Sequence, residues 1–350
     1  MGESRPLRIV VFGATGHLGQ QLLRALEESD WPIAELVGVG SEESAGAELE
    51  FRGEPLDVAS EWPPLKGRDL VFVCTPSEVA LEIVREALRA EVPCIDCSGA
   101  LAAQAEVPMP VRAAELEGEG VEGGAALASA PLLEVASPTA LAWVPILEAL
   151  SRAAGVERLV ATVLCSAAAW GRRGLVSLSE ETIALFNQAA SPDTGPAGQT
   201  VAFDVIPGGG IDEARVEADL ERLFDGALRV SLTSAQVPTF VGEGSALSLE
   251  LASPIEQAAL ESLLEAVPGV TLVAQGIGSR GLAAVEEGVP EPAGPTLRDS
   301  VGSGGILVGR LRPDPSLPAG LGWRLWASFD PLALTSEHAL RLGALRLGLA

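Results

Sequence analysis

The fold of this chain is decided near its start, by Leu7-Arg8-Ile9-Val10-Val11-Phe12 and the stretch that follows, Gly13-Ala14-Thr15-Gly16-His17-Leu18-Gly19. The first stretch is an almost continuous apolar run, which is typical of a strand buried on both faces. The second stretch is rich in glycine and predicts a turn. Residues 18–28 then carry leucine and alanine at helical spacing. A strand, a glycine turn and a helix in this order predict the first unit of a doubly wound parallel sheet.

The glycine turn is also the first candidate binding site. A helix that begins here offers free N–H groups and the positive end of its dipole, and glycine lets a phosphate approach the backbone closely. We therefore predict that the turn holds the pyrophosphate of a dinucleotide. The residues assigned to this site are Gly13, Thr15, Gly16, His17, Leu18 and Gly19. The alternative is a tight turn that binds nothing, because the G-x-x-G-x-x-G pattern alone is weakly specific.

The segment after the second predicted strand bears on which dinucleotide fits. That strand covers residues 34–39 and is followed by Ser41-Glu42-Glu43-Ser44-Ala45-Gly46. An NADP site needs a cation here for the 2′-phosphate, whereas an NAD site uses an acid on the ribose hydroxyls. Glu43 would repel a 2′-phosphate, so Glu43 and Ser44 favour NAD over NADP. The alternative is that Glu43 is a solvated charge on an acidic surface.

The rest of the chain predicts two domains. Strands at residues 69–73 and 92–97 flank a helix at 78–90, which continues the Rossmann-like α/β sheet. From about residue 135 the pattern changes to that of an α+β domain, with alternating strands that suit a sheet with one open face. Helices are predicted at 139–154, 180–190, 212–224, 254–267 and 336–349, strands at 159–166, 228–236, 245–252, 306–312 and 323–328, and a long loop at 276–304. We expect a first domain of residues 1–135, completed by a C-terminal helix at 332–350, and a second domain of residues 136–331.

The charge balance excludes some partners. The 350 residues include 48 acidic and 23 basic residues, a formal net charge of −25, and the only lysine is Lys66. Such a field repels phosphate backbones and anionic lipids, so we expect no nucleic-acid and no membrane partner. The apolar stretch at 125–150 is interrupted by Pro131, Glu134, Pro138 and Pro145, so it does not predict a membrane span. The first residues lead directly into a strand without a signal peptide, and we expect a cytoplasmic protein.

The four cysteines do not suggest a disulfide framework. Cys94-Ile95-Asp96-Cys97 spells C-x-x-C, which can be a redox pair or half of a zinc site. A zinc site needs two more ligands, and the two histidines, His17 and His338, lie far off in the sequence. We therefore expect buried, structural cysteines at the end of a parallel strand, and no metal.

Several ordered motifs resemble those of the aspartate-semialdehyde dehydrogenase family, and most closely its divergent Usg-type homologues. They are the glycine turn, Glu43-Ser44-Ala45-Gly46, Cys97-Ser98-Gly99 with Val107-Pro108, Ser166 to Arg173, Val201 to Pro207, Gln236-Val237-Pro238, Val308 to Arg312 and Trp326 to Asp330. The resemblance implies an NAD(P)-binding domain, a second domain whose sheet forms a homodimer, and a role in amino-acid biosynthesis. In the family's reaction a cysteine thiolate attacks the aldehyde, hydride passes to NADP and phosphate resolves the thioester. A histidine serves as acid and base, and arginines hold the anionic substrate.

The resemblance also implies that this site has changed. The family's cysteine falls on Ser137, or on Ala136 if the alignment shifts by one residue, and its histidine falls on Glu243. Its two substrate arginines fall on Gln236 and Ala102. A hydroxyl without an adjacent base is a poor nucleophile, and an acid would repel an anionic substrate. These replacements predict a protein that is catalytically inactive or weak.

Two other functions stay open. The chain is an active oxidoreductase of this family if another cysteine serves as nucleophile, and Cys97 and Cys165 are then the candidates. It is a scaffold or small-molecule binding protein if only the old cleft is used. A hydrolytic pair of Ser137 and Glu243 is disfavoured, because a serine nucleophile needs a histidine-like base and neither histidine is well placed.

Overall fold

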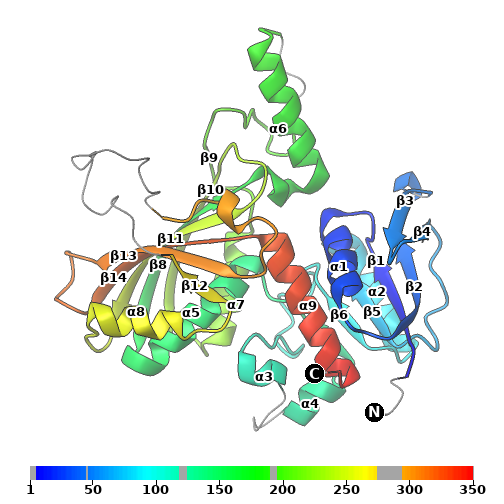
Figure 1. The fold of residues 1–350 in the computed structure, drawn as a ribbon, viewed down its shortest axis with the longest axis horizontal. Helices are drawn as coiled ribbons and strands as arrows, with labels where there is room; N and C mark the ends of the chain where they lie inside the picture. Colours follow the sequence, from blue (N-terminus) through cyan, green and yellow to red (C-terminus); the bar gives the residue numbers. More distant parts are fainter. Residues whose placement is uncertain (1–4, 45, 118–123, 190–194, 274–293, 350) are drawn as a thin grey trace. The chain divides into compact units, whose positions relative to one another are not determined.

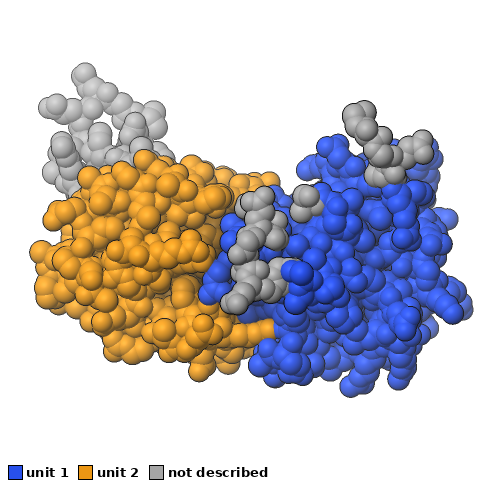
Figure 2. Space-filling model, turned by 90° about the horizontal axis from the view of Figure 1, so that it is seen from below, with its two compact units in different colours: residues 1–141, 335–350 blue, residues 142–334 orange. Residues whose placement is uncertain are grey.

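The computed structural model describes residues 5–44, 46–117, 124–189, 195–273 and 294–349. The chain forms two compact units, residues 1–141 with 335–350 and residues 142–334 (Figure 2). The sequence placed the boundaries at 135/136 and 331/332. Residues 276–293 of the expected loop at 276–304 lie outside the described residues.

Unit 1 is built on a seven-stranded sheet in the order β3-β4-β2-β1-β5-β6-β7. Its strands are β1 (Leu7–Phe12), β2 (Ile33–Val39), β3 (Glu48–Phe51), β4 (Glu54–Ala59), β5 (Leu70–Val73), β6 (Cys94–Asp96) and β7 (Leu132–Glu134). Strand β1 lies in the middle and pairs in parallel with both β2 and β5. The predicted Rossmann-like sheet is confirmed, because the apolar runs of β1 and β5 are buried on both faces as a central parallel strand requires.

The helices of unit 1 follow the same pattern. They are α1 (His17–Glu28), α2 (Ser77–Arg89), the short α3 (Ala113–Glu117) and α4 (Gly124–Ser129), and most of α9 (Pro331–Leu347). Figure 1 shows α1 and α2 beside the strands of this sheet. Buried side chains of α2, such as Ile83, pack with those of β1 and β5, such as Val10 and Val71, into one hydrophobic cluster. The C-terminal helix expected at 332–350 runs from Pro331 to Leu347, so it begins five residues before the periodic pattern at 336–349.

Unit 2 has a seven-stranded mixed sheet in the order β12-β13-β14-β11-β8-β10-β9. Its strands are β8 (Val156–Cys165), β9 (Ile206–Pro207), β10 (Arg229–Gln236), β11 (Glu243–Leu251), β12 (Val270–Leu272), β13 (Ile306–Pro313) and β14 (Gly322–Phe329). Its helices are α5 (Pro138–Ala154, which begins in unit 1), α6 (Gly171–Phe186), α7 (Glu213–Leu223) and α8 (Gln257–Glu265), and Figure 1 shows α5 and α8 against one face of the sheet. On β14, buried Leu325 and Ala327 alternate with the half-buried Arg324 and Trp326. The predicted sheet with one open face is therefore confirmed.

The prediction missed the short elements α3, α4, β7, β9 and β12, and two further differences have a local reason. The hairpin β3–β4 was missed, because its turn is Arg52-Gly53, in which both residues have positive φ (53° and 79°) and arginine is an uncommon first residue. Helix α6 was predicted to begin at residue 180 but begins at Gly171. The first turns of α6 were not predicted because glycine is a poor helix former. Gly174 is nevertheless required, since a Cβ there would lie 2.1 Å from the carbonyl oxygen of Ala167.

No helix among the described residues is long and apolar enough to cross a membrane. The apolar stretch at 125–150 instead supplies β7 and most of α5, which continues through Pro145.

Candidate functional site

The glycine turn between β1 and α1 is held tightly by its neighbours. The N–H groups of Gly13 and Ala14 donate to the carbonyl oxygen of Val39 at 2.8 and 3.1 Å. Gly13 has a φ of +79°, and a Cβ there would lie 2.5 Å from the carbonyl oxygen of Cys74. A Cβ on Gly19 would lie 2.1 Å from the carbonyl oxygen of Gly13. Both glycines are therefore required by the turn itself, one for its backbone conformation and one for close packing of helix on strand.

The start of α1 has the features of an anion site. Gly16 is the N-cap, no side chain caps the helix, and its first turn holds no acidic residue. Gly16 is exposed and adopts an ordinary φ of −71°. Its missing side chain thus leaves room above the helix end, where the helix dipole favours negative charge. His17 was expected inside the turn, but it is the first residue of the helix.

The loop after β2 meets this turn. A Cβ on Gly40 would lie 3.2 Å from Oγ of Ser44 and 3.3 Å from Oγ1 of Thr15, so these two hydroxyls flank the same glycine. Oγ of Ser44 also shares a hydrogen bond of 2.7 Å with Oγ of Ser41. Glu43 lies beside them in the single turn Glu42–Ser44 and is exposed. The structure therefore brings the residues assigned from the sequence to one edge of the sheet, outside the carboxyl ends of β1 and β2.

Sequence reasoning missed Thr75 at the same edge. Its hydroxyl is buried and has no hydrogen-bond partner among the described residues, and its N atom lies 3.1 Å from where a Cβ of Gly13 would be. Thr75 follows β5, the strand on the other side of β1 from β2. In an open α/β sheet, ligands bind outside the carboxyl ends of the strands, at the point where the strand order reverses. The available signal was a Thr-Pro pair one residue after the end of a buried strand.

Cys74 and Cys97 directly follow the carboxyl ends of β5 and β6, and Cys94 is the first residue of β6. A hydrogen bond with Cys74, followed by burial, raises the pKa of the Cys97 thiol well above its usual value. Burial is the main cause that raises the pKa of Cys94. All four cysteines are free. Cys97 is therefore a weak nucleophile at neutral pH, since the thiolate is the reactive form.

A second group of site residues meets in unit 2, at the ends of three neighbouring strands. In the register of the sheet, Cys165 on β8 pairs with Gln236 on β10 and with Glu243 on β11. All three side chains are buried. Oε1 of Gln236 accepts a hydrogen bond of 3.1 Å from Nε1 of Trp170, and its Nε2 donates to the carbonyl oxygen of Val237. These two hydrogen bonds, both within unit 2, hold the side-chain amide of Gln236 in place.

Cys165 is a poor nucleophile in this setting. Burial, and then the negative charges of Glu243 and Glu213, raise the pKa of its thiol far above the usual value. Both causes oppose the thiolate that an attack on an aldehyde requires.

The remaining predicted positions lie in unit 1. Ala136 and Ser137 are buried just before α5, and Ala102 lies in the loop after β6. His338 on α9 is buried, with Nε2 at 2.9 Å from the carbonyl oxygen of Pro110, and burial lowers its pKa to about 4. A histidine with this pKa is uncharged at pH 7. Its contact with the carbonyl oxygen of Pro110 has a structural role.

Comparison with known proteins supports the resemblance found in the sequence. Residues 8–118 match the family model of the semialdehyde dehydrogenase NAD-binding domain. An aspartate-semialdehyde dehydrogenase of Rickettsia bellii is 26% identical over 339 residues, which cover 94% of each chain. A USG-1 protein homologue of Pseudomonas aeruginosa is 28% identical over 339 residues, covering 93% of each. The structure of aspartate-semialdehyde dehydrogenase II from Vibrio cholerae shares the fold with a TM-score of 0.84, at 23% identity over 97% of this chain and 98% of that one.

These likenesses run along both units, and the matched NAD-binding model begins in β1 and contains the glycine turn. The resemblance found in the sequence is therefore confirmed: the chain matches a semialdehyde dehydrogenase NAD-binding domain and is similar along nearly its whole length to aspartate-semialdehyde dehydrogenases and to a USG-1 homologue.

Proposed function

We propose that this chain still binds a dinucleotide, preferably NAD, and has little or no dehydrogenase activity. The observation that carries the first half is the turn of Gly13, Gly16 and Gly19, which keeps the close contacts of a dinucleotide-binding turn in front of an uncapped helix. The match to an NAD-binding family model supports it. The exposed Glu43 supports the choice of NAD, because it would repel the 2′-phosphate of NADP.

The second half of the proposal concerns the chemistry. By alignment, the nucleophile and the base of the family fall on Ser137 and Glu243. The two other cysteines considered, Cys97 and Cys165, have raised thiol pKa values. His338 has a lowered pKa and is buried. Loss of a nucleophile alone lowers a rate by several powers of ten, so the expected turnover is negligible.

Calorimetric titration of the purified protein with NAD, NADH, NADP and NADPH at moderate salt tests cofactor binding. We expect NAD or NADH to bind with a sub-millimolar dissociation constant, and NADP and NADPH to bind more weakly. If none of the four binds at millimolar concentration, the dinucleotide part of the proposal is refuted.

The role of Glu43 has a matched control in its neighbour. Glu43→Gln should strengthen NADP binding by about fivefold, since one charge close to the 2′-phosphate contributes about 1 kcal/mol in water. Glu42→Gln removes the same charge from the same exposed turn and should change little. Equal effects of the two variants, or no effect of either, would show that Glu43 does not select the cofactor.

An active oxidoreductase is the second candidate, favoured by the likeness to aspartate-semialdehyde dehydrogenases over more than nine-tenths of the chain. An assay with aspartate semialdehyde, phosphate and each dinucleotide separates the two. We expect a rate at background for the wild type and for Cys97→Ala and Cys165→Ala alike. A measurable wild-type rate that one of these substitutions abolishes would establish the active enzyme and identify its nucleophile.

A homodimer through unit 2 is part of the proposal. Support comes from the large apolar side chains that α6 and the 201–207 segment expose, notably Phe186 (76% exposed) and Phe203 (67%), whose rings meet edge to face at 5.7 Å. Apolar groups of this size at a surface commonly mark an interface. Sedimentation velocity should give a dimer, and Phe186→Ser with Phe203→Ser should weaken it. A monomeric wild type would refute this part.

A further inference from the structure

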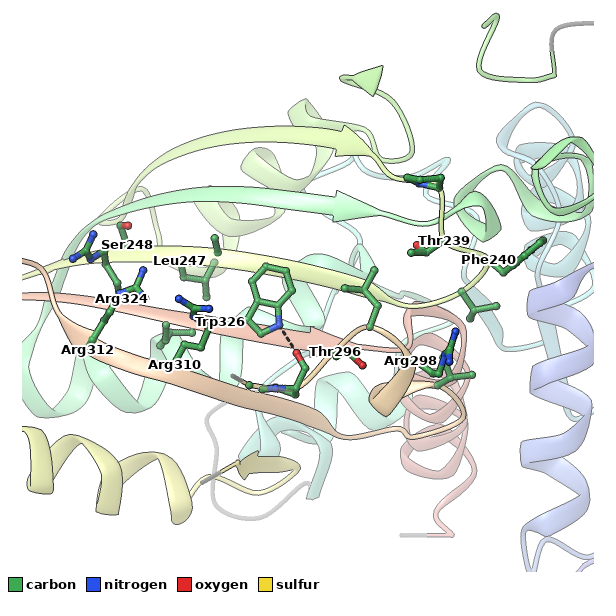
Figure 3. A pocket seen from close by; sticks show the side chains of 18 residues that line it. Thr239, Phe240, Leu247, Ser248, Thr296, Arg298, Arg310, Arg312, Arg324 and Trp326 are labelled. Carbon is green, nitrogen blue, oxygen red and sulfur yellow. Dashed lines mark hydrogen bonds between the residues drawn. The ribbon is translucent and has the colours of Figure 1, made fainter. Parts of the chain in front are cut away.

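The open face of the unit 2 sheet carries a hollow, in which Figure 3 shows Arg310, Arg312 and Arg324 together at one end. The register of β13 shifts between Gly309 and Arg312, and with this bulge Arg310 and Arg312 are both exposed. Since the resemblance gives this face to the homodimer, these arginines are expected to lie between two chains. A different feature that the proposed function leaves unused lies in unit 1, where three of the four cysteines follow or begin neighbouring strands.

The two cysteines of the C-x-x-C motif do not lie where they can react with each other. Cys94 begins β6 and packs in one hydrophobic cluster with Val71 of β5 and Ile83 of α2. Cys97 comes three residues later, about 10 Å along an extended chain and on the opposite face of the sheet. The Cα atoms of a disulfide are at most about 6.8 Å apart, so the fold excludes a bond between Cys94 and Cys97.

Cys97 instead has Cys74 as its neighbour. Strands β5 and β6 pair in parallel with Val73 opposite Asp96, so Cys74 and Cys97, one residue further along each strand, are opposite one another. The ladder continues to this point, since the N–H of Cys97 donates to the carbonyl oxygen of Val73 at 2.9 Å. A hydrogen bond also joins the two thiols. The structure therefore gives the second cysteine of the motif a partner that the sequence pattern does not contain.

This pair has the spacing and the access that a disulfide requires. Residues opposite one another on neighbouring strands have Cα atoms about 4.8 Å apart, within the range of about 4.4–6.8 Å found for disulfides. Their side chains also point to the same face of the sheet. Cys74 and Cys97 are both half-buried, so a small reagent can reach them, whereas Cys94 and Cys165 are buried.

Cys74 also contacts the glycine turn. Its N–H donates to the carbonyl oxygen of Phe12 at 2.9 Å, and its own carbonyl oxygen lies 2.5 Å from where a Cβ of Gly13 would be. Thr75, with its buried hydroxyl, follows directly. A disulfide that draws Cys74 towards β6 therefore moves the backbone against which Gly13 packs.

We propose that Cys74 and Cys97 form a reversible oxidation site, in which an intramolecular disulfide weakens dinucleotide binding at the adjoining turn. The effect on binding rests on the proposed function, whereas the disulfide itself does not. The oxidant is a small disulfide such as oxidised glutathione.

The reaction proceeds by thiol–disulfide exchange in two steps. One cysteine loses its proton, and its thiolate attacks the reagent, which releases one glutathione thiolate and leaves a mixed disulfide. The thiolate of the second cysteine then attacks the protein sulfur of this mixed disulfide and displaces the second glutathione. The two protein thiols thus give up two electrons and two protons, and the reagent takes them up as two thiols. The second step is favoured because its reactants are neighbours.

The disulfide is tested on the reduced, full-length protein, which is incubated with oxidised glutathione, then denatured and alkylated. The incubation is run at pH 9, because the raised pKa of the Cys97 thiol makes its thiolate scarce at pH 7. We expect two of the four cysteines to escape alkylation without carrying glutathione. Peptide mapping with cleavage before Asp96, which separates Cys94 from Cys97, should join Cys74 to Cys97. Cys97→Ala should abolish the disulfide, whereas Cys94→Ala, the matched control from the same motif, should keep it.

Calorimetric titration with NAD then compares the reduced and the oxidised protein. Oxidation should weaken NAD binding at least about fivefold, and reduction with dithiothreitol should restore it. Cys94→Ala should show the same loss and the same recovery as the wild type.

The mapping and the titration can each overturn the part that they test. The oxidation site is overturned if no disulfide forms, if the bond involves Cys94 or Cys165, or if it joins two chains. An oxidised protein that binds NAD as tightly as the reduced one overturns the effect on binding. If the reduced protein binds no dinucleotide, the proposed function is refuted together with its regulation, while the peptide map still decides whether Cys74 and Cys97 form the disulfide.

Discussion

Gly19→Ala should lower the free energy of unfolding by about 2 kcal/mol, although alanine is the better helix former. Gly19 lies inside α1 and is buried, and a Cβ there would come within 2.1 Å of the carbonyl oxygen of Gly13 and 2.8 Å of Cα of Ala14. Both atoms belong to the backbone of the turn, so the helix itself would have to move. The higher helix propensity of alanine stabilises the protein by about 1 kcal/mol, and overpacking of this kind destabilises it by about 3 kcal/mol. The net effect on stability is therefore a loss.

Urea unfolding and calorimetric titration, run side by side, separate the two roles of the turn. Gly19→Ala should reduce stability and, by moving the helix end, also abolish NAD binding. Gly16→Ala is the control, because its Cβ would meet nothing closer than the carbonyl oxygen of Gly13 at 3.3 Å. It should cost less than about 1 kcal/mol of stability while weakening NAD binding, since the new methyl group occupies the approach of the pyrophosphate. A Gly19→Ala protein as stable as the wild type would contradict the packing argument.

The second large effect is a loss of stability in mild acid that comes from His338. Burial, with a smaller contribution from the charge of Arg341, lowers the pKa of His338 to about 4, whereas its hydrogen bond with Pro110 acts in the opposite direction. The unfolded chain, with a histidine pKa of about 6.5, therefore binds more protons than the folded one between these two values. The stabilisation is complete above about pH 6.5 and is lost as the pH falls towards 4. Between pH 7 and pH 5 the loss amounts to about 2 kcal/mol.

Urea unfolding of the wild type and of His338→Gln at both pH values isolates this contribution. The variant should be less stable at pH 7, because the contact with the carbonyl oxygen of Pro110 is weakened, but it should lose about 2 kcal/mol less than the wild type on going to pH 5. Carboxylates that titrate in acid contribute to both proteins and cancel in the comparison. If both lose the same free energy, His338 titrates normally and its burial has no electrostatic consequence.

Local sequence was enough to predict the first sheet and its binding turn. Buried parallel strands such as β1 and β5 read as unbroken apolar runs, and a glycine turn before a helix has few structural alternatives. The alternating strands of the second sheet, such as β14, likewise predicted one open face. The glycine at position 174 and the Arg52-Gly53 turn misled the prediction, because their reasons are close contacts and positive φ angles that no local pattern records.

The sequence by itself therefore determined the resemblance to the aspartate-semialdehyde dehydrogenase family, the doubly wound sheet and the position of the glycine turn, because these depend on motifs, on periodicity and on neighbours along the chain. Only the tertiary structure placed Thr75 beside Gly13, Cys165 between Gln236 and Glu243, and Arg310, Arg312 and Arg324 on one open face. The last two groupings depend on strand register and on one bulge, and a register shift of a single residue would send these side chains to the opposite face. The raised thiol pKa values and the lowered histidine pKa have the same origin, since burial and neighbouring charge exist only once the chain has folded.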